Sequence, residues 1–369
     1  MDFDLTPDQK LFRATTKKFL DTEVPLSTVR EWASEGFRRD WWTRGAELGW
    51  TALLVPEDQG GGSVSDAGLL DLLIVAEEMG RMVSPGPLGP VNTVIAALVE
   101  AGGHAETLEA LVSGETVATW AVHEPVSGFN PSAPGVTAVE TADGWTLNGV
   151  KNPVETADQA DLFLVTADAG QFLVPAADVR VEPVKSLDLV RRFGTVHLDD
   201  VHVPASALVS ASVERQCLIA SLLQSAETAG AVDRVFEFTV AWAFDRYSFG
   251  RPLASYQALK HRFADMKTWL EAIHGIVSAA GRAVQDRAPN AAELVAAAGS
   301  YVGTKSVEII QDCVQIHGGI GVTWEHDLHL YLRRATVNRA LYGTPEEHRR
   351  TLARLVIGQQ GVIAKGKAA

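Results

Sequence analysis

Cysteine is scarce in this sequence. The 369 residues include two cysteines, Cys217 and Cys313, and neither belongs to a CxxC pair. A disulfide framework or a thiolate metal site needs several cysteines at suitable spacing. Two isolated residues instead indicate structural thiols in a reducing compartment.

Basic residues and long apolar runs are also in short supply. The formal net charge is -14 and the isoelectric point is about 5.2, which argues against a surface for nucleic acid. Apolar runs fall short of the roughly 20 residues that a membrane-spanning helix needs. The N-terminus carries Asp2, Asp4 and Asp8 rather than a basic stretch before an apolar run, so no signal peptide is expected. We therefore expect a cytoplasmic protein without a membrane span.

Helical patterns dominate the first hundred residues. Thr6, Pro7 and Gln9 form a helix start with a capping box, and Ser65 and Asp66 are expected to open a helix that runs to Glu78. Another helix is expected from Val91 to Glu100.

From about Thr116 short runs of β-branched and aromatic residues alternate with turn residues, which predicts strands. Ala142, Asp143 and Gly144 read as a hairpin turn. The expected strands are Val117–Val122, Val136–Val139, Trp145–Leu147, Leu162–Val165, Phe172–Val174, Val179–Val184 and Thr195–Leu198.

After Pro204 the pattern returns to helices. They are expected over about Glu214–Arg246, Ser255–Gln285, Asn290–His317 and Pro345–Gly358. Contiguous blocks of helices, strands and helices predict an α+β protein of three domains, over residues 1–115, 116–208 and 209–369.

Two segments of the C-terminal region carry candidate binding residues. The first runs from Arg246 through Ser248, Phe249 and Gly250 to Gln257. An Arg beside a Gly-containing turn offers donors suited to a pyrophosphate, and Phe249 offers an apolar face. On local grounds alone, a plain helix end, where a cation meets the helix dipole, is the better explanation of the Arg.

The second segment ends a helix with Gln315, His317, Gly318 and Gly319. Paired glycines let a backbone approach a ligand or another chain closely. A simple helix stop is the alternative.

In this order, behind a β-rich middle region, the two segments resemble the signatures of the acyl-CoA dehydrogenase family across nearly the whole chain. The stretch Leu48–Glu57 with its following glycines is similar to that family's N-terminal domain. The resemblance implies a helical N-terminal domain, a β-barrel-like middle domain and a C-terminal four-helix bundle. It also implies FAD as cofactor, an acyl-CoA substrate that is converted to the 2-enoyl-CoA, and a separate electron acceptor.

The resemblance further implies a cofactor-binding set in this chain. Its members are Arg246, Ser248, Phe249, Gln257, Gln315, His317, Gly318, Gly319 and Thr344.

The family's catalytic base is missing from both of its usual positions. Where the family has the Glu of a Tyr-Glu-Gly-Thr motif, this chain has Tyr342 before Gly343 and Thr344. A tyrosine, with an ordinary pKa of about 10, is a poor base near neutral pH. Counting back from Arg246 by the spacing of the second family position reaches Ala220. Glu227 is the nearest carboxylate after it, and a salt bridge or structural hydrogen bond is its expected role.

The middle region departs from the family as well. The family's flavin-binding Thr-Glu-Pro and Gly-Ser motifs correspond here to the run from His123 to Phe129. The Trp-Ile-Thr motif that packs against the flavin would fall at Asn152–Thr156, where the Trp is missing.

The retained elements are those that one subunit of the family contributes to its neighbour's flavin. The resemblance is therefore to the base-lacking subunits of actinobacterial α2β2 dehydrogenases, some of which act on steroid side-chain CoA thioesters. A homologous partner would supply the catalytic Glu. The alternatives are a self-sufficient homotetramer that uses Glu227, and a structural or regulatory subunit without flavin.

A metal site is not expected. His326 and His329 lie one helical turn apart, but no third ligand is evident. Glu346, Glu347 and His348 follow Pro345 at a helix start, where capping explains the acidic residues.

Overall fold

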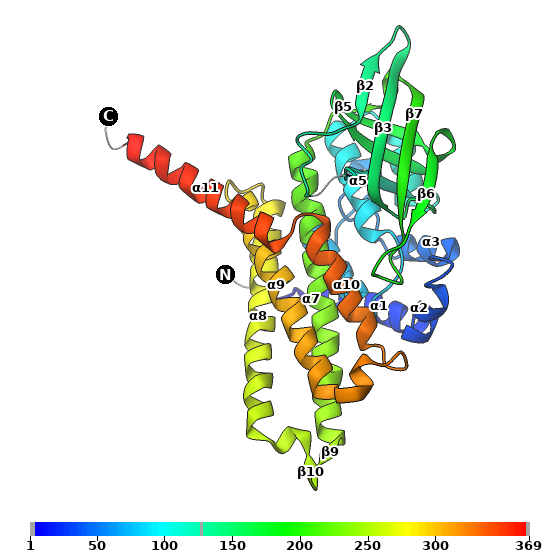
Figure 1. Cartoon of the computed structure of the whole chain (residues 1–369). Helices are drawn as coiled ribbons and strands as arrows, with labels where there is room; N and C mark the ends of the chain where they lie inside the picture. Colours follow the sequence, from blue (N-terminus) through cyan, green and yellow to red (C-terminus); the bar gives the residue numbers. More distant parts are fainter. Residues whose placement is uncertain (1–3, 126–127, 367–369) are drawn as a thin grey trace. The chain divides into compact units, whose positions relative to one another are not determined.

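The computed structural model describes residues 4–125 and 128–366, with side chains to residue 357 (Figure 1). The chain divides into two compact units. The N-terminal unit takes in Leu5–Ala76 and Ser84–Ala220, and the C-terminal unit takes in Glu77–Val83 and the chain from Ser221 onward.

Six helices in the described part of the chain precede the strands. They are α1 (Pro7–Glu23), α2 (Leu26–Trp32), α3 (Arg39–Glu47), α4 (Gly68–Met82), α5 (Leu88–Ala101) and α6 (Ala105–Val112). The predicted capping box is present, because the Thr6 side chain accepts from the Gln9 amide and the Gln9 side chain accepts from the Thr6 amide.

The predicted start of α4 was wrong by a few residues. Asp66 has a φ of 59°, which a right-handed helix does not accept, and Ser65 donates instead to Asp71 over 2.7 Å. The helix therefore begins at Gly68.

Two four-stranded sheets follow. One has the order β1-β4-β5-β8 and the other β2-β3-β7-β6. Their strands are β1 (Ala118–Ala121), β2 (Thr137–Glu140), β3 (Gly144–Glu155), β4 (Leu162–Ala167), β5 (Gly170–Pro175), β6 (Arg180–Val184), β7 (Phe193–Pro204) and β8 (Leu208–Val209). Seven of these match expected runs, and the two-residue β8 was missed. The expected barrel-like domain is thus a pair of sheets, and the described strands form no closed barrel.

The two sheets share one apolar core. Phe163 and Phe172 from one sheet and Leu147 and Val196 from the other belong to a single buried cluster. The predicted hairpin turn joins β2 to β3, where Glu140 faces Trp145 and the Thr141 amide donates to the Gly144 carbonyl over 2.8 Å. Strands β1, β4 and β5 are almost continuously buried, whereas β7 partly alternates buried and exposed residues, so the shared core lies between the two sheets.

Long helices make up most of the remaining chain. They are α7 (Val213–Asp245), α8 (Gln257–Gln285), α9 (Ala291–His317), α10 (Leu328–Leu341) and α11 (Pro345–Gly366). Helix α9 packs against α8, α10 and α11. The expected helical C-terminal region is confirmed, but with five helices in the described residues instead of the four of a simple bundle. Sequence patterns missed α10.

The boundaries at residues 115 and 208 stay a prediction. Among the described residues, no helix combines the length and apolar character needed to cross a membrane.

Candidate functional site

A small hairpin joins α7 to α8 and carries the first candidate segment. Strands β9 (Tyr247–Ser248) and β10 (Arg251–Pro252) pair antiparallel, with Phe249 and Gly250 forming the two-residue loop between them. Their φ angles of 50° and 79° are both positive, as a type I′ turn requires. Gln257 is the first residue of α8 and is exposed.

The hairpin is braced from inside the chain. The Tyr256 hydroxyl donates to the Ser248 carbonyl over 2.8 Å, and the Arg251 guanidinium lies 3.9 Å from the centroid of the Tyr256 ring. The Leu253 amide donates to the Arg246 carbonyl over 2.8 Å. These contacts fix the loop and leave its tip to solvent.

Phe249 lies at that tip, where both its solvent exposure and its backbone conformation are energetically unfavourable. Its side chain is 96% exposed, and its backbone adopts a left-handed conformation that a bulky residue seldom takes. Exposure forfeits the burial of an aromatic ring, and the φ of 50° adds strain. Strain of this kind is concentrated at functional sites, which makes the exposed Phe249 a candidate for one.

The second candidate segment lies beside the first. The His317 ring stacks on the Trp242 ring with centroids 5.2 Å apart and an interplanar angle of 16°. The Arg246 guanidinium is 6.0 Å from the centroid of the same Trp242 ring. Trp242 therefore connects the Arg246 hairpin to the end of α9.

His317 is a buried, oriented side chain. Its Nδ1 lies 2.8 Å from the Cys313 carbonyl, an acceptor, so Nδ1 carries the proton. Burial lowers the pKa of His317 below its ordinary value, and His326 lowers it further while the Cys313 hydrogen bond opposes the shift. The ring is thus a neutral packing element at the helix end.

The glycines after His317 leave open space. A Cβ atom built on Gly318 or Gly319 would meet no described atom within 4 Å, and both residues are exposed. Gly318 has a φ of 69°, so it ends α9 and leads into the 3-10 turn η5 (Gly318–Val322). Room beside a glycine backbone, next to an exposed guanidinium, is what a pyrophosphate or adenine needs. Gln315 is also exposed on the last turn of α9.

Thr344 has a structural partner. Its hydroxyl accepts from the Glu347 amide over 3.2 Å and donates to the Glu347 carboxylate over 3.0 Å, and the Thr344 amide donates to the same carboxylate over 2.7 Å. These bonds cap the start of α11. Tyr342 lies at the C-terminal cap of α10 and is half-buried.

Glu227 is tied into α10. Its Oε1 lies 2.5 Å from Arg334, which is 1% exposed, and its Oε2 accepts from Asn338 over 3.1 Å. Asn338 also donates to Thr228 over 2.9 Å. Both oxygens of Glu227 thus serve contacts between α7 and α10. Ala220, at the family's second base position, is an aliphatic residue with 2% exposure.

The middle-region segment at His123 makes polar and ring contacts within this chain. Lys151, which has no exposed side chain, forms an ion pair with Glu124, and Glu124 accepts from the Gly135 amide over 2.8 Å. The His123 ring lies 5.0 Å from the Phe129 ring. Burial, and then the charge of Lys151, lower the pKa of His123 to about 4, so the ring is neutral. Val126 and Ser127 lie outside the described residues.

The expected Trp-Ile-Thr position is occupied by polar and ionic contacts as well. The Asn152 amide donates to the His123 carbonyl over 2.9 Å, and Glu155 forms an ion pair with Arg191 over 2.9 Å. Both contacts lie along β3, beside a register shift between Lys151 and Val154. Among the described residues, the segment thus carries a buried Lys151 paired with a partly exposed Glu124, beside a half-buried His123.

The histidines that resembled a metal pair are packed among rings. His326 lies 4.7 Å from His317 and 5.5 Å from Phe238, whereas His329 stacks on Trp324 at 4.6 Å. Sequence reasoning missed Trp242 and Arg334, and it assigned no role to Tyr256. Arg334 and Asn338 stand four residues apart in a helix, and this spacing was the available signal for a polar contact facing α7.

Comparisons with known proteins identify the family of this chain. Residues 6–115 match the model "Acyl-CoA dehydrogenase, N-terminal domain", and residues 213–357 match "Acyl-CoA dehydrogenase, C-terminal domain". The chain belongs to the FAD-dependent acyl-CoA dehydrogenase family. Among its relatives is "Acyl-CoA dehydrogenase IpdE2" of Mycolicibacterium smegmatis, 30% identical over 94% of this chain and 98% of that protein.

Two solved structures are similar over nearly their full length. The ChsE4-ChsE5 complex from Mycobacterium tuberculosis matches with a TM-score of 0.87 and 25% identity over 97% of this chain and 99% of that chain. A variant of the Tcur3481-Tcur3483 steroid ACAD matches with a TM-score of 0.86 and 26% identity over 98% of this chain and 99% of that chain. Both names describe pairs of chains.

The two units differ in how well they fit the family's cofactor. In the C-terminal unit, the exposed Arg246, the tip residue Phe249 and the open glycines fit the pyrophosphate and adenine half of FAD. In the N-terminal unit, the Lys151–Glu124 pair occupies the segment where the family holds the flavin ring.

Proposed function

We propose that this chain is one subunit of a heteromeric, FAD-dependent acyl-CoA dehydrogenase. In this assembly, it supplies the adenine-side half of a flavin site that lies at an interface, and a homologous partner supplies the catalytic Glu. An α2β2 assembly would contain both kinds of subunit that this flavin site needs. The observation that carries the proposal is the double loss of the base: Tyr342 stands at one position, and Glu227 near the other is bound to Arg334.

The reaction removes the α proton and the β hydride of an acyl-CoA thioester to give the 2-enoyl-CoA. Bound FAD supplies the hydride acceptor, and its electrons pass to a separate acceptor. A general base must come within about 3 Å of the α proton. In this chain Glu227 is held by two residues of α10, so the partner's carboxylate would remove the α proton.

The residues of this chain bind and orient. Arg246 would neutralise the pyrophosphate with a charge-assisted contact, and Phe249 would pack against the partner-held cofactor. The backbone at Gly318 and Gly319 would lie along the nucleotide, with Gln257 and Gln315 as exposed amide donors. Ser248 and Thr344 would support the site without contacting the nucleotide directly. The Ser248 carbonyl accepts a hydrogen bond from Tyr256, and the Thr344 hydroxyl donates one to Glu347.

The proposed substrate is a bulky acyl-CoA, with steroid side-chain thioesters as the leading class. Support comes from the similarity to a steroid ACAD built of two chains. The acyl group itself contacts the partner's active site in this scheme, so pocket shape there would set the final specificity.

Co-expression with a homologue that carries the Tyr-Glu-Gly-Thr motif tests the proposal. We expect a stable complex that dehydrogenates a steroid side-chain CoA and transfers electrons to an artificial acceptor. Changing the partner's Glu to Gln should abolish turnover and retain the flavin. Turnover that survives this change, or a chain that assembles only with itself, would contradict the proposal.

A further inference from the structure

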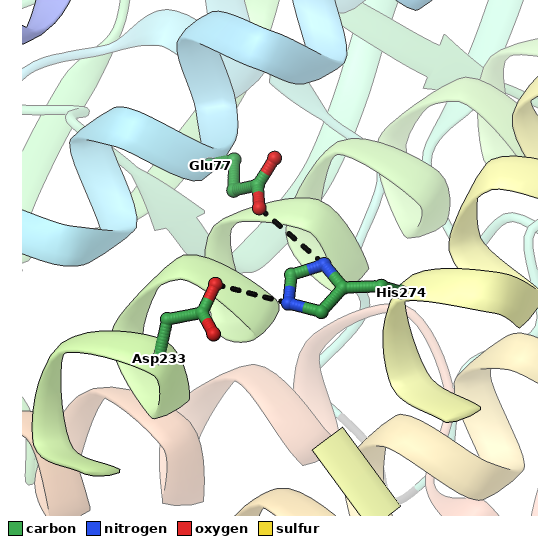
Figure 2. A group of neighbouring side chains, drawn as sticks. All are labelled: Glu77, Asp233 and His274. Atoms are coloured by element: carbon green, nitrogen blue, oxygen red, sulfur yellow. Dashed lines mark ion pairs between the residues drawn. The ribbon is translucent and has the colours of Figure 1, made fainter. Parts of the chain in front are cut away.

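Within the C-terminal unit, residues from three helices place a histidine between two carboxylates (Figure 2). His274 lies on α8, Glu77 on α4 and Asp233 on α7. The His274 Nε2 is 2.9 Å from Asp233 Oδ2, and its Nδ1 is 3.4 Å from Glu77 Oε1. Each ring nitrogen therefore faces a different helix.

The two carboxylates are close because α4 and α7 cross at glycines. A Cβ atom on Gly80 would lie 1.8 Å from the Glu227 carbonyl oxygen, and one on Gly230 would lie 1.8 Å from the Glu77 carbonyl oxygen. Larger residues at either position would force the helices apart. The crossing thus fixes the spacing of Glu77 and Asp233 independently of His274.

The surroundings of the ring are acidic. Besides Glu77 and Asp233, the carboxylate of Glu271 on α8 acts on His274. Arg81 on α4 engages Glu237 over 2.6 Å and lies 3.9 Å from Asp233. Its Nε is 3.8 Å from Glu78, and Arg234 on α7 lies 3.7 Å from Glu237. Asp233 is therefore closer to His274 than to the Arg81 guanidinium.

We propose that His274 is a protonated clamp that joins α8 to α4 and α7, and that rising pH releases it. One imidazolium can donate to both carboxylates at once, because both ring nitrogens then carry protons. A neutral ring donates only once, so deprotonation removes one bond and leaves two carboxylates facing a neutral group. Glu77, Asp233 and His274 also each offer one ligand atom within 4.8 Å of the others, so metal binding is the competing role that an experiment must separate from the clamp.

The titration follows from these contacts. Burial alone would lower the pKa of His274, but the hydrogen bond with Asp233 and the charges of Asp233, Glu77 and Glu271 raise it above its ordinary 6.5. A group whose pKa is higher in the folded state contributes stability that is fully present below its unfolded pKa. That contribution is lost as pH rises from about 6.5 through the folded pKa.

A histidine NMR titration of the full chain with ¹⁵N-labelled imidazole tests the clamp. The His274 signal, assigned by its loss in His274→Gln, should titrate with a midpoint above the ordinary histidine value of 6.5. Asp233→Asn should lower its midpoint, and Glu77→Gln should lower it less, because its contact is longer. The matched control is Asp265→Asn, which removes an exposed carboxylate from the same helix and should leave the midpoint unchanged.

Thermal unfolding supplies the second measurement. The melting temperature of the wild type should exceed that of His274→Gln at pH 6, and the gap should close toward pH 9. A His274 midpoint at or below 6.5, or a difference in melting temperature that does not depend on pH, would overturn the proposal. Stoichiometric binding of added Zn²⁺ at micromolar concentration, lost in His274→Gln, would replace the clamp with a metal site and overturn it as well.

Discussion

Trp242 stacks face to face with His317, at 5.2 Å between ring centroids, and thereby joins the end of α7 to the end of α9. The Arg246 guanidinium lies over the same indole, one turn beyond it. Two segments far apart in sequence thus present an exposed cation and an open glycine backbone on one side of the C-terminal unit. The arrangement needs no ligand to hold it, because the contacts are internal to the chain.

Arg246→Ala should lower the flavin content of the assembled complex. The loss of a charge-assisted contact costs about 1.5 to 3 kcal/mol, or roughly 10- to 150-fold in the dissociation constant of FAD. Flavin titration of the apo complex measures it. Arg350→Ala, which removes an exposed arginine from α11, is the control and should bind FAD as the wild type does. Equal affinities of the two variants would refute a role for Arg246 in cofactor binding.

Phe249→Gly should separate stability from function. Glycine accepts the φ of 50° without strain, so the folded chain should be as stable as the wild type or more stable, by about 1 kcal/mol. The exposed ring is lost at the same time, so FAD affinity or assembly with the partner should fall. Urea unfolding of the chain and flavin retention of the complex are the paired measurements. A destabilised chain with normal flavin retention would show that Phe249 serves its own hairpin.

Glu227→Gln should destabilise the fold without removing the catalytic base. Breaking a buried ion pair by changing one partner costs on the order of 3 to 5 kcal/mol, with the lower end expected here because Gln keeps one hydrogen bond. Glu227→Gln combined with Arg334→Met should cost less than the sum of the single changes. In the intact complex turnover should change by less than about tenfold, whereas a fall of roughly 100-fold at saturating substrate would identify Glu227 as the base.

Acid should destabilise the middle region through His123. Its pKa of about 4 in the folded state lies below its ordinary 6.5, so the neutral ring contributes stability above pH 6.5 that is lost as pH falls toward 4. Relative to His123→Gln, the wild type should lose about 2 kcal/mol of unfolding free energy between pH 7.5 and pH 5. Urea midpoints at the two pH values check this. A difference that stays constant with pH would mean that the ring titrates normally.

Local patterns predicted most of the elements. The Thr6 capping box and the turn at Gly144 were readable because each depends on neighbouring residues alone. The start of α4 was misplaced because Ser65 bonds to Asp71 instead of capping the helix at Asp66. Helix α10 was missed because its apolar positions do not form a clear stripe, and its buried Arg334 looks like a surface residue in sequence.

The candidate site was only partly predictable for the same reason. Arg246, Phe249 and the glycines stand in motifs that can be recognised one residue at a time. Three other contacts depend on how distant parts of the chain pack together. They are the stacking of Trp242 on His317, the hydrogen bond from Tyr256 to the Ser248 carbonyl, and the ion pair of Glu227 with Arg334. The contact of Lys151 with Glu124 likewise joins strand β3 to a loop 27 residues away in sequence.

Flavin content, measured for the chain purified alone and for the chain co-purified with a partner that bears the Glu, tests the division of the site most directly. On the proposed division of the site, the chain alone should be colourless and inactive, because it would supply only the adenine-side elements, and Lys151 pairs with Glu124 in its middle-region segment. The complex should carry FAD at one equivalent per pair of chains, lost when Arg246 is changed to Ala. A yellow, active protein obtained from this chain alone would contradict the division.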